Sequence, residues 1–364
     1  MKLIDGLSLY PLYSPHTGHA EAHAYRLGTP ERGIEISSPS ERSALLALRN
    51  GHDPYSVVAE SDYSKIDSLV AALTRINFLI VQESPLLIPR RYLDHVTERD
   101  VAANQIRERA KPELVPLQWS GNAHDRGVTA LGKRAQAHIE LSGRSRVLTL
   151  VHSILIASGV LRISFSDKDR ERAVNFTDIG ISTIRASDLG SNYYALQESW
   201  RRDNALFPTS RKGTREVGDQ RPTLTIHDGP VDADLLADWM SSKQPHLLIH
   251  RPNGNQIAIG PLVIPTTTPC LRCLHLYELE HYNSSIMDCD PLTEVRELPM
   301  HMAHTIAGAI SAAALSYIDH LTDPIEKLSD MCVGEKITYQ FLHSTQPHRV
   351  TISRHPLCGC RDLL

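Results

Sequence analysis

The chain has 364 residues, long enough for two domains, and its 38 basic against 42 acidic residues give a formal net charge of -4. This balance offers no electrostatic case for a nucleic-acid partner, and no apolar run approaches the roughly 20 residues that cross a bilayer. The first residues are too polar for a secretory signal. Six cysteines without a disulfide-scaffold pattern fit a reducing compartment. We therefore expect a cytoplasmic protein with no nucleic-acid or membrane partner.

Residues 1–90 read as one compact unit in which three short strands precede three helices. Turn-forming Pro, Gly and His residues separate the strand candidates, and Ser38, Pro39 and Glu41 together form a helix-start signal. The expected strands are Leu7–Leu12, Ala20–Leu27 and Ile34–Ser37, and the expected helices begin at Ser38, after Pro54 and at Ser64. This order predicts a small winged-helix-like module.

The rest of the chain divides at about residue 135. Residues 91–135 are polar and charged, with scattered Pro and Gly, and are expected to be a linker or peripheral structure. Residues 136–364 alternate strand and helix candidates, which predicts a parallel α/β domain. The segment from Arg185 to Arg221 lacks apolar periodicity and is expected to be a mobile surface excursion. A long helix over Pro299–Leu321 is rich in small residues, so we expect it to pack against another helix or a partner subunit.

Two closely spaced cysteine pairs predict a structural zinc site. Cys270 and Cys273 form a CxxC pair, and Cys358 and Cys360 form a CxC pair. Four thiolates in two tight turns are the ligand set of a tetrahedral zinc that has no open position for a substrate. We expect this metal to hold the fold together and to perform no chemistry.

The cysteine-containing blocks resemble those of a known family. The stretch Ile259–Leu276, which contains the CxxC pair, and the block His355–Cys360 are similar to the ThiF-like leader-peptide-binding proteins of thiazole/oxazole-modified microcin clusters. The resemblance covers nearly the whole chain. It implies a PqqD-like recognition module at residues 1–90 and a ThiF-like Rossmann-type domain at 136–364. The zinc site predicted from the four cysteines would lie in this ThiF-like domain.

The resemblance implies a role as a binding protein without catalysis of its own. Family members bind the leader of a ribosomally made precursor peptide and present it to a YcaO-type cyclodehydratase, which forms azoline rings. The leader adds as a strand to an exposed sheet edge. The family, together with the small-residue helix, also predicts a homodimer.

The peptide groove implied by the resemblance has an edge strand on one side and a helix on the other. The predicted contacts are Gly33, Ile34, Glu35, Ile36 and Ser37 on the strand, and Lys65, Leu69, Val70 and Leu73 on the helix. An alternative stays open: the apolar residues among them could be the core of the module itself.

The nucleotide site of ThiF-type enzymes is expected to be degenerate here. Only Gly143 stands where a GxGxxG turn would be expected, and the side chain of Arg144 obstructs close backbone approach to a phosphate. Asp167 ends the second strand, where an acidic residue would hold a ribose hydroxyl. The arginine-glutamine pair and the lysine of active members are missing, so ATP binding is not expected. The alternative function is an ATP-dependent ThiF-type adenylating or peptide-modifying enzyme.

Overall fold

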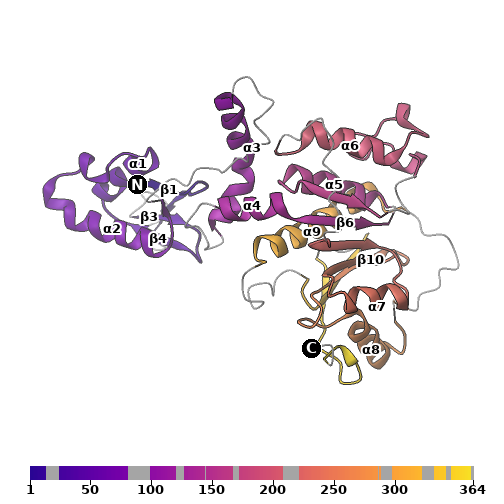
Figure 1. Ribbon diagram of the computed structural model, residues 1–364. Helices are drawn as coiled ribbons and strands as arrows, with labels where there is room; N and C mark the ends of the chain where they lie inside the picture. The colour runs from indigo at the N-terminus through magenta and orange to yellow at the C-terminus, as the bar shows by residue number, and fades with distance from the viewer. Residues whose placement is uncertain are drawn as a thin grey trace. The chain divides into compact units, whose positions relative to one another are not determined.

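The computed structural model describes residues 1–13, 24–80, 99–119, 127–143, 145–166, 172–207, 221–285, 287, 297–321, 332–341 and 346–361. The chain divides into two compact units, which are treated separately below (Figure 1). The first unit comprises Met1–Leu87 and Arg107–Leu131, and the second comprises Ile88–Ile106 and Gly132–Leu364.

The first unit contains the three predicted strands, β2 to β4, in front of its helices, and a further short strand, β1, that precedes them. Its elements are β1 (Lys2–Leu3), β2 (Leu9–Leu12), β3 (Ala24–Gly28), β4 (Gly33–Ile36), α1 (Pro39–Arg49), α2 (Tyr63–Arg75) and β5 (Leu79–Ile80). Strands β2, β3 and β4 form an antiparallel sheet in that order, and β1 pairs with β5. The expected second helix is a pair of short 3-10 helices, Pro54–Val57 and Glu60–Asp62.

Helix α1 begins where the sequence predicts, because its first residues cap one another. The hydroxyl of Ser38 accepts a hydrogen bond from the backbone N–H of Glu41 at 3.2 Å. The Glu41 carboxylate in turn accepts from the backbone N–H of Ser38 at 2.9 Å. Pro39 fits the first turn, where its missing N–H costs no hydrogen bond. The helix ends before Gly51, whose φ of 77° is in the left-handed region.

The segment expected to be a linker or peripheral structure, 91–135, is mostly helical in its described residues. They form α3 (Arg99–Trp119) and most of α4 (Val128–Gln136). The C-terminal half of α3 belongs to the first unit: the Trp119 ring lies 5.4 Å from that of Phe78, and the guanidinium of Arg32 donates to the carbonyl oxygen of Trp119. The apolar pattern is too sparse to predict this helix, and Pro112 and Pro116 lie inside it.

The second unit is built on a seven-stranded sheet, which confirms the predicted α/β class. The strand order is β12-β11-β10-β9-β8-β6-β7. Its first four strands along the chain are mutually parallel, and the last three add to the sheet antiparallel. The strands are β6 (His138–Ser142), β7 (Arg162–Phe165), β8 (Leu224–Asp228), β9 (His246–Ile249), β10 (Gln256–Val263), β11 (Glu335–Gln340) and β12 (His348–Thr351).

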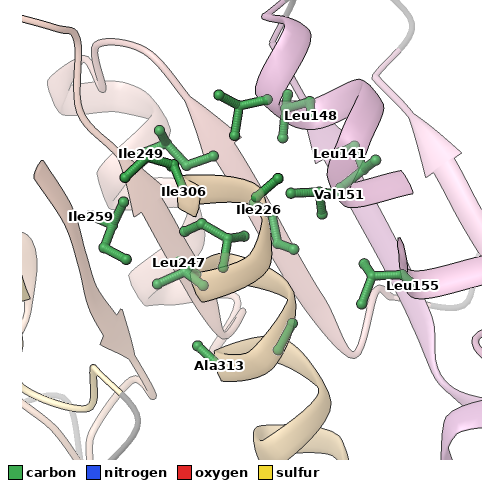
Figure 2. Close-up of a cluster of buried hydrophobic side chains, with 14 of the residues drawn as sticks. Leu141, Leu148, Val151, Leu155, Ile226, Leu247, Ile249, Ile259, Ile306 and Ala313 are labelled. Carbon is green, nitrogen blue, oxygen red and sulfur yellow. The ribbon is translucent and has the colours of Figure 1, made fainter. Parts of the chain in front are cut away.

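Helices cover both faces of this sheet. The long helices are α5 (Arg146–Ala157), α6 (Tyr193–Asn204), α7 (Ala233–Ser241), α8 (Leu271–Tyr282) and α9 (Met300–Asp319). Every residue of β9 is buried, because Leu247 and Ile249 point to the α5 and α9 side while Leu248 points to the α7 and α8 side. Figure 2 shows the first of these cores, with Ile306 of α9 beside Leu247 and Ile249.

Helix α9 packs against α5, so the prediction that the small-residue helix meets another helix is confirmed.

A buried ion pair joins α9 to α4. The guanidinium of Arg134 donates to both carboxylate oxygens of Asp319, at 2.8 and 2.7 Å, and both side chains are at most 7% exposed. Two parallel hydrogen bonds of this kind fix both distance and orientation.

The expected mobile excursion at Arg185–Arg221 is wrong for its described part. Residues 193–204 form α6, and Leu206 and Phe207 after it are at most 2% exposed. The backbone N–H of Leu206 donates to the carbonyl of Ile156 at 3.2 Å, which ties the segment to α5. Helix α6 buries polar side chains such as Gln197, so its inner face does not read as apolar in the sequence. Residues 208–220 lie outside the described part. No helix in the described part is long and apolar enough to span a membrane.

Candidate functional site

The four predicted zinc ligands come together in one buried cluster. The Sγ atoms of Cys270, Cys273, Cys358 and Cys360 all lie within 4.8 Å of one another, and each residue is at most 6% exposed. Three of the separations are 3.8 Å (Cys270–Cys273), 3.5 Å (Cys270–Cys358) and 3.6 Å (Cys273–Cys360). Tetrahedral zinc with bonds of about 2.3 Å places its sulfur ligands about 3.8 Å apart. The cluster therefore fits a metal ion of this size.

Local structure explains how two distant segments deliver these thiols. Cys270 precedes α8 and Cys273 lies in its first turn, while Cys358 and Cys360 come from a turn and a short 3-10 helix, Gly359–Arg361. The backbone N–H of His355 donates to the Sγ of Cys273 at 3.4 Å, which stabilises negative charge on that sulfur. Burial raises the pKa of the Cys360 thiol to about 11, so metal binding must displace a proton there.

The predicted strand edge is present in the first unit. Strand β4 pairs with β3 on one side and is the terminal strand of its sheet, so its other edge has no strand partner among the described residues. Glu35 and Ser37 are exposed, and Gly33 and Ile34 are half-buried. Ile36 is only 1% exposed and belongs to the core of the unit. The strand thus offers its backbone and four of its five predicted contact residues.

The helix predicted as the other wall of the groove is α2, and it is mostly committed to the core. Leu69 and Leu73 are at most 4% exposed and pack in the same cluster as Ile36. Val70 is half-buried and Lys65 is exposed, with its ammonium 2.8 Å from the carboxylate of Asp62. The alternative interpretation is therefore right for Ile36, Leu69 and Leu73. Of the helix residues, Lys65 and Val70 remain accessible to a ligand.

The predicted degenerate nucleotide site lies at the carboxyl ends of the parallel strands. Gly143 follows β6 with a φ of 125°, and a Cβ at this position would lie 2.6 Å from the carbonyl oxygen of Asp228. Only glycine fits such a turn. A cavity of about 230 Å³ opens beside it, lined in part by Ser145, Asp228, Arg251 and Glu297. Ligands of open α/β sheets bind at this edge. Arg144 and Asp167 lie outside the described residues.

The N-terminus of α5, which would face a phosphate in this fold class, is occupied by the chain's own side chains. The Ser145 hydroxyl accepts from the backbone N–H of Leu148 at 3.4 Å. The Glu297 carboxylate accepts from the backbone N–H of Arg146 at 3.1 Å. The Arg146 guanidinium lies 3.7 Å from Glu297 and donates to the carbonyl of Leu298 at 3.0 Å. Internal acceptors thus satisfy two of the N–H donors at the helix start, those of Arg146 and Leu148, which would otherwise be available to an anion.

Two carboxyl groups give the cavity an acidic character. Burial raises the pKa of Asp228 to about 7, and the neighbouring Glu297 adds to the shift while a hydrogen bond from Ser145 opposes it. Burial also raises the pKa of Glu297, against the hydrogen bond from Arg146. One carboxylate oxygen of Asp228 is buried and has no hydrogen-bond partner among the described residues. Glu297 thus disfavours ionisation of Asp228, and either carboxyl repels phosphate when it is ionised.

Sequence reasoning missed both of these acids. Asp228 could have been found from the sequence, because it is an acidic residue at the end of a buried apolar strand. The same pattern led to the prediction for Asp167. Glu297 could not, because it precedes α9 and is 151 residues from Arg146 in the chain. Only the tertiary fold places its carboxylate at the start of α5.

The comparisons with known proteins support the fold. No protein-family model and no curated protein sequence matches the chain. Solved structures do match. E. coli MccB in complex with AMPCPP and MccA has a TM-score of 0.64 at 14% identity, covering 99% of this chain and 98% of that one. The microcin C7 biosynthetic enzyme MccB in complex with N-formylated MccA has a TM-score of 0.63 at 14% identity, with 99% of each chain covered. PaaA has a TM-score of 0.60 at 16% identity, covering 91% and 96%. The chain therefore has an MccB-like, ThiF-type fold.

Proposed function

We propose that this chain binds the leader of a ribosomally synthesised precursor peptide and delivers it to a YcaO-type cyclodehydratase for azoline formation. The observation that carries the proposal is the edge of β4 that has no strand partner among the described residues, on a strand whose Ile36 packs in one core cluster with Leu69 and Leu73 of α2. An extended peptide that adds to such an edge gains main-chain hydrogen bonds and exposes alternate side chains to the neighbouring surface. The fold of MccB, which is solved in complex with MccA, supports a peptide ligand for this architecture.

The contacts that we propose for the leader are those of β4 and α2 that solvent reaches. Backbone groups of Gly33 to Ser37 would pair with the leader, and Ile34 and Val70 would contact its apolar side chains. Glu35 and Lys65 carry opposite charges at the surface, so they can select leader residues of opposite charge. The cyclodehydratase itself would be a separate protein.

The ThiF-type domain serves in this proposal as a zinc-bound scaffold that does not use ATP. The four cysteines would hold a structural Zn²⁺, and the side-chain caps at the start of α5 would keep phosphate out. We also propose that the protein is cytoplasmic and homodimeric.

The second candidate is an ATP-dependent adenylating enzyme. It is favoured by one observation: structures of MccB, which has the same fold, contain ATP or AMPCPP. The cavity beside Asp228 is where a nucleotide would lie on this sheet. Titration of Mg-ATP into the zinc-loaded protein, with and without peptide, separates the two candidates.

Two proline variants test peptide binding at β4. Successive residues of a strand point their N–H groups to opposite edges of the strand. Of the two variants Ile34→Pro and Glu35→Pro, one therefore removes an N–H that points away from the sheet. The other removes an N–H that points toward β3. Calorimetry with a precursor leader peptide should show that the variant that lacks the outward N–H loses binding while its melting temperature is retained. Equal affinity of wild type and both variants would rule out strand addition at β4.

A further inference from the structure

The first unit carries a second candidate binding surface, away from the β4 edge. A cavity of about 430 Å³ lies between the N-terminal segment, β2 and α1, with Leu27 of the central strand also in its wall. Because β3 separates β2 from β4, and neighbouring strands lie about 4.8 Å apart, a peptide strand added to β4 does not reach β2. The two surfaces can therefore be occupied at the same time.

One face of α1 shapes this cavity. Arg42, Leu45, Leu46 and Arg49 all line it, and their spacing of i, i+3, i+4 and i+7 places them on a single helix face. Leu45 is buried, whereas Leu46 is 52% exposed and lies between the exposed Arg42 and Arg49. The face thus presents an apolar centre between two cations.

The charged side chains that line the cavity are mostly positive, and one of them, Arg42, is held in place by a neighbouring residue. Lys2, Arg42 and Arg49 line it against a single carboxylate, that of Asp5. The Arg42 guanidinium lies 4.7 Å from the centre of the Tyr25 ring and donates to its hydroxyl at 3.2 Å, so its position is fixed. Within the described part of the chain, Lys2 and Arg49 form no ion pair. These two cations are available to an outside acid.

The wall opposite α1 is also held in place. The backbone N–H of Asp5 donates to the Oε1 of Gln118 at 3.1 Å, and the carbonyl of Asp5 accepts from the indole N–H of Trp119 at 3.2 Å. Leu3 and Ile4 beside it are buried in the core of the unit. A pre-formed apolar cleft with a cationic rim loses little conformational entropy when a ligand enters it.

We propose that this cavity is a docking surface for the modifying enzyme. The cavity would bind a segment of that enzyme in which leucine-like side chains are flanked by carboxylates. Charge complementarity favours this occupant. The exposed cations would repel a basic segment, and a neutral segment would offer Lys2 and Arg49 no ionic partners. The enzyme as the source of the segment rests on the proposed function. The chemistry of the segment rests on the cavity alone.

A pair of labelled probe peptides tests the chemistry. An acetylated Asp-Glu-Leu-Leu-Glu-Asp peptide should bind the full-length protein in fluorescence anisotropy, and the charge-reversed Lys-Arg-Leu-Leu-Arg-Lys peptide should not. Arg49→Glu and Leu46→Asp should each weaken binding of the acidic probe at least tenfold. Both side chains are exposed, so the variants should keep the wild-type melting temperature. The matched control is Arg75→Glu on α2, an exposed cation that does not line the cavity.

A second measurement separates this inference from the proposed function. Leader binding should be unchanged in Arg49→Glu, while binding of a purified YcaO-type cyclodehydratase should be lost. If the leader fails to bind the wild type, the proposed function is wrong whatever the acidic probe does. Equal binding of both probes, full binding by Arg49→Glu, or binding of anionic lipid vesicles in place of the acidic probe would overturn the docking surface.

Discussion

The carboxylate of Glu297 caps the helix that starts at Arg146, with 3.1 Å between its Oε2 and the Arg146 backbone nitrogen. A helix start normally offers free N–H groups and a partial positive charge, which together attract anions. Here an acid from a segment 151 residues further along the chain satisfies that position. The backbone N–H of Arg146 at this edge of the sheet is therefore capped by a residue that is remote in sequence.

Removal of this cap should open the helix start to phosphate. We expect wild-type protein to give no heat with Mg-ATP, and Glu297→Ala to bind inorganic phosphate or Mg-ATP with at least tenfold higher affinity. Glu297→Gln removes the repelling charge but keeps an acceptor, so its gain should be smaller. Glu60→Gln, an exposed acid in the other unit, is the matched control. Tight Mg-ATP binding by the wild type would favour the adenylating enzyme.

Serine in place of a clustered cysteine should remove the metal. We expect purified wild-type protein to carry one equivalent of zinc by atomic emission, and Cys358→Ser or Cys360→Ser to carry much less, with loss of stability in the second unit. Cys332→Ser is the control, because Cys332 is also buried but lies outside the cluster. A full equivalent of zinc in the Cys360→Ser variant would contradict the ligand assignment.

Asp228 should make the second unit less stable as the pH rises. Its pKa increases from 3.8 unfolded to about 7 folded, so its contribution is complete below pH 4 and is lost by pH 7. The full shift corresponds to at most about 4 kcal/mol, and partial exposure of the residue reduces this. Urea unfolding from pH 4 to 8 should therefore show wild type losing stability relative to Asp228→Asn. A constant difference between the two proteins would mean that Asp228 titrates normally.

The buried pair of Arg134 and Asp319 should be sensitive to the loss of one partner. Asp319→Ala leaves a guanidinium buried without its carboxylate, which should lower the free energy of unfolding by about 3–5 kcal/mol. Replacement of both residues by Met and Leu should be far milder. Glu108→Ala breaks an exposed pair with Lys111 and should change little. Denaturant titration measures all three, and a mild effect of Asp319→Ala alone would refute the argument.

The sequence predicted those features that depend on local pattern. The capping residues Ser38 and Glu41 mark the start of α1, and the cysteine spacings predict a cluster that the fold brings together. Features that depend on remote partners could not be predicted in this way. Helix α6 buries Gln197 and Arg201, and the Glu297 cap exists only in three dimensions. The apolar pattern was also ambiguous on α2, where Leu69 and Leu73 would read alike as core or as groove.

The cysteine cluster has a consequence for the unfolded chain. Cys270 and Cys358 are 88 residues apart, and β11 and β12 lie between them. An ion that stayed bound to both cysteine pairs after unfolding would act as a cross-link. Closing a loop on the order of 100 residues lowers the conformational entropy of the denatured ensemble, which corresponds to about 4–5 kcal/mol. A chelator would then lower the melting temperature of the second unit while the melting of residues 1–80 stayed constant.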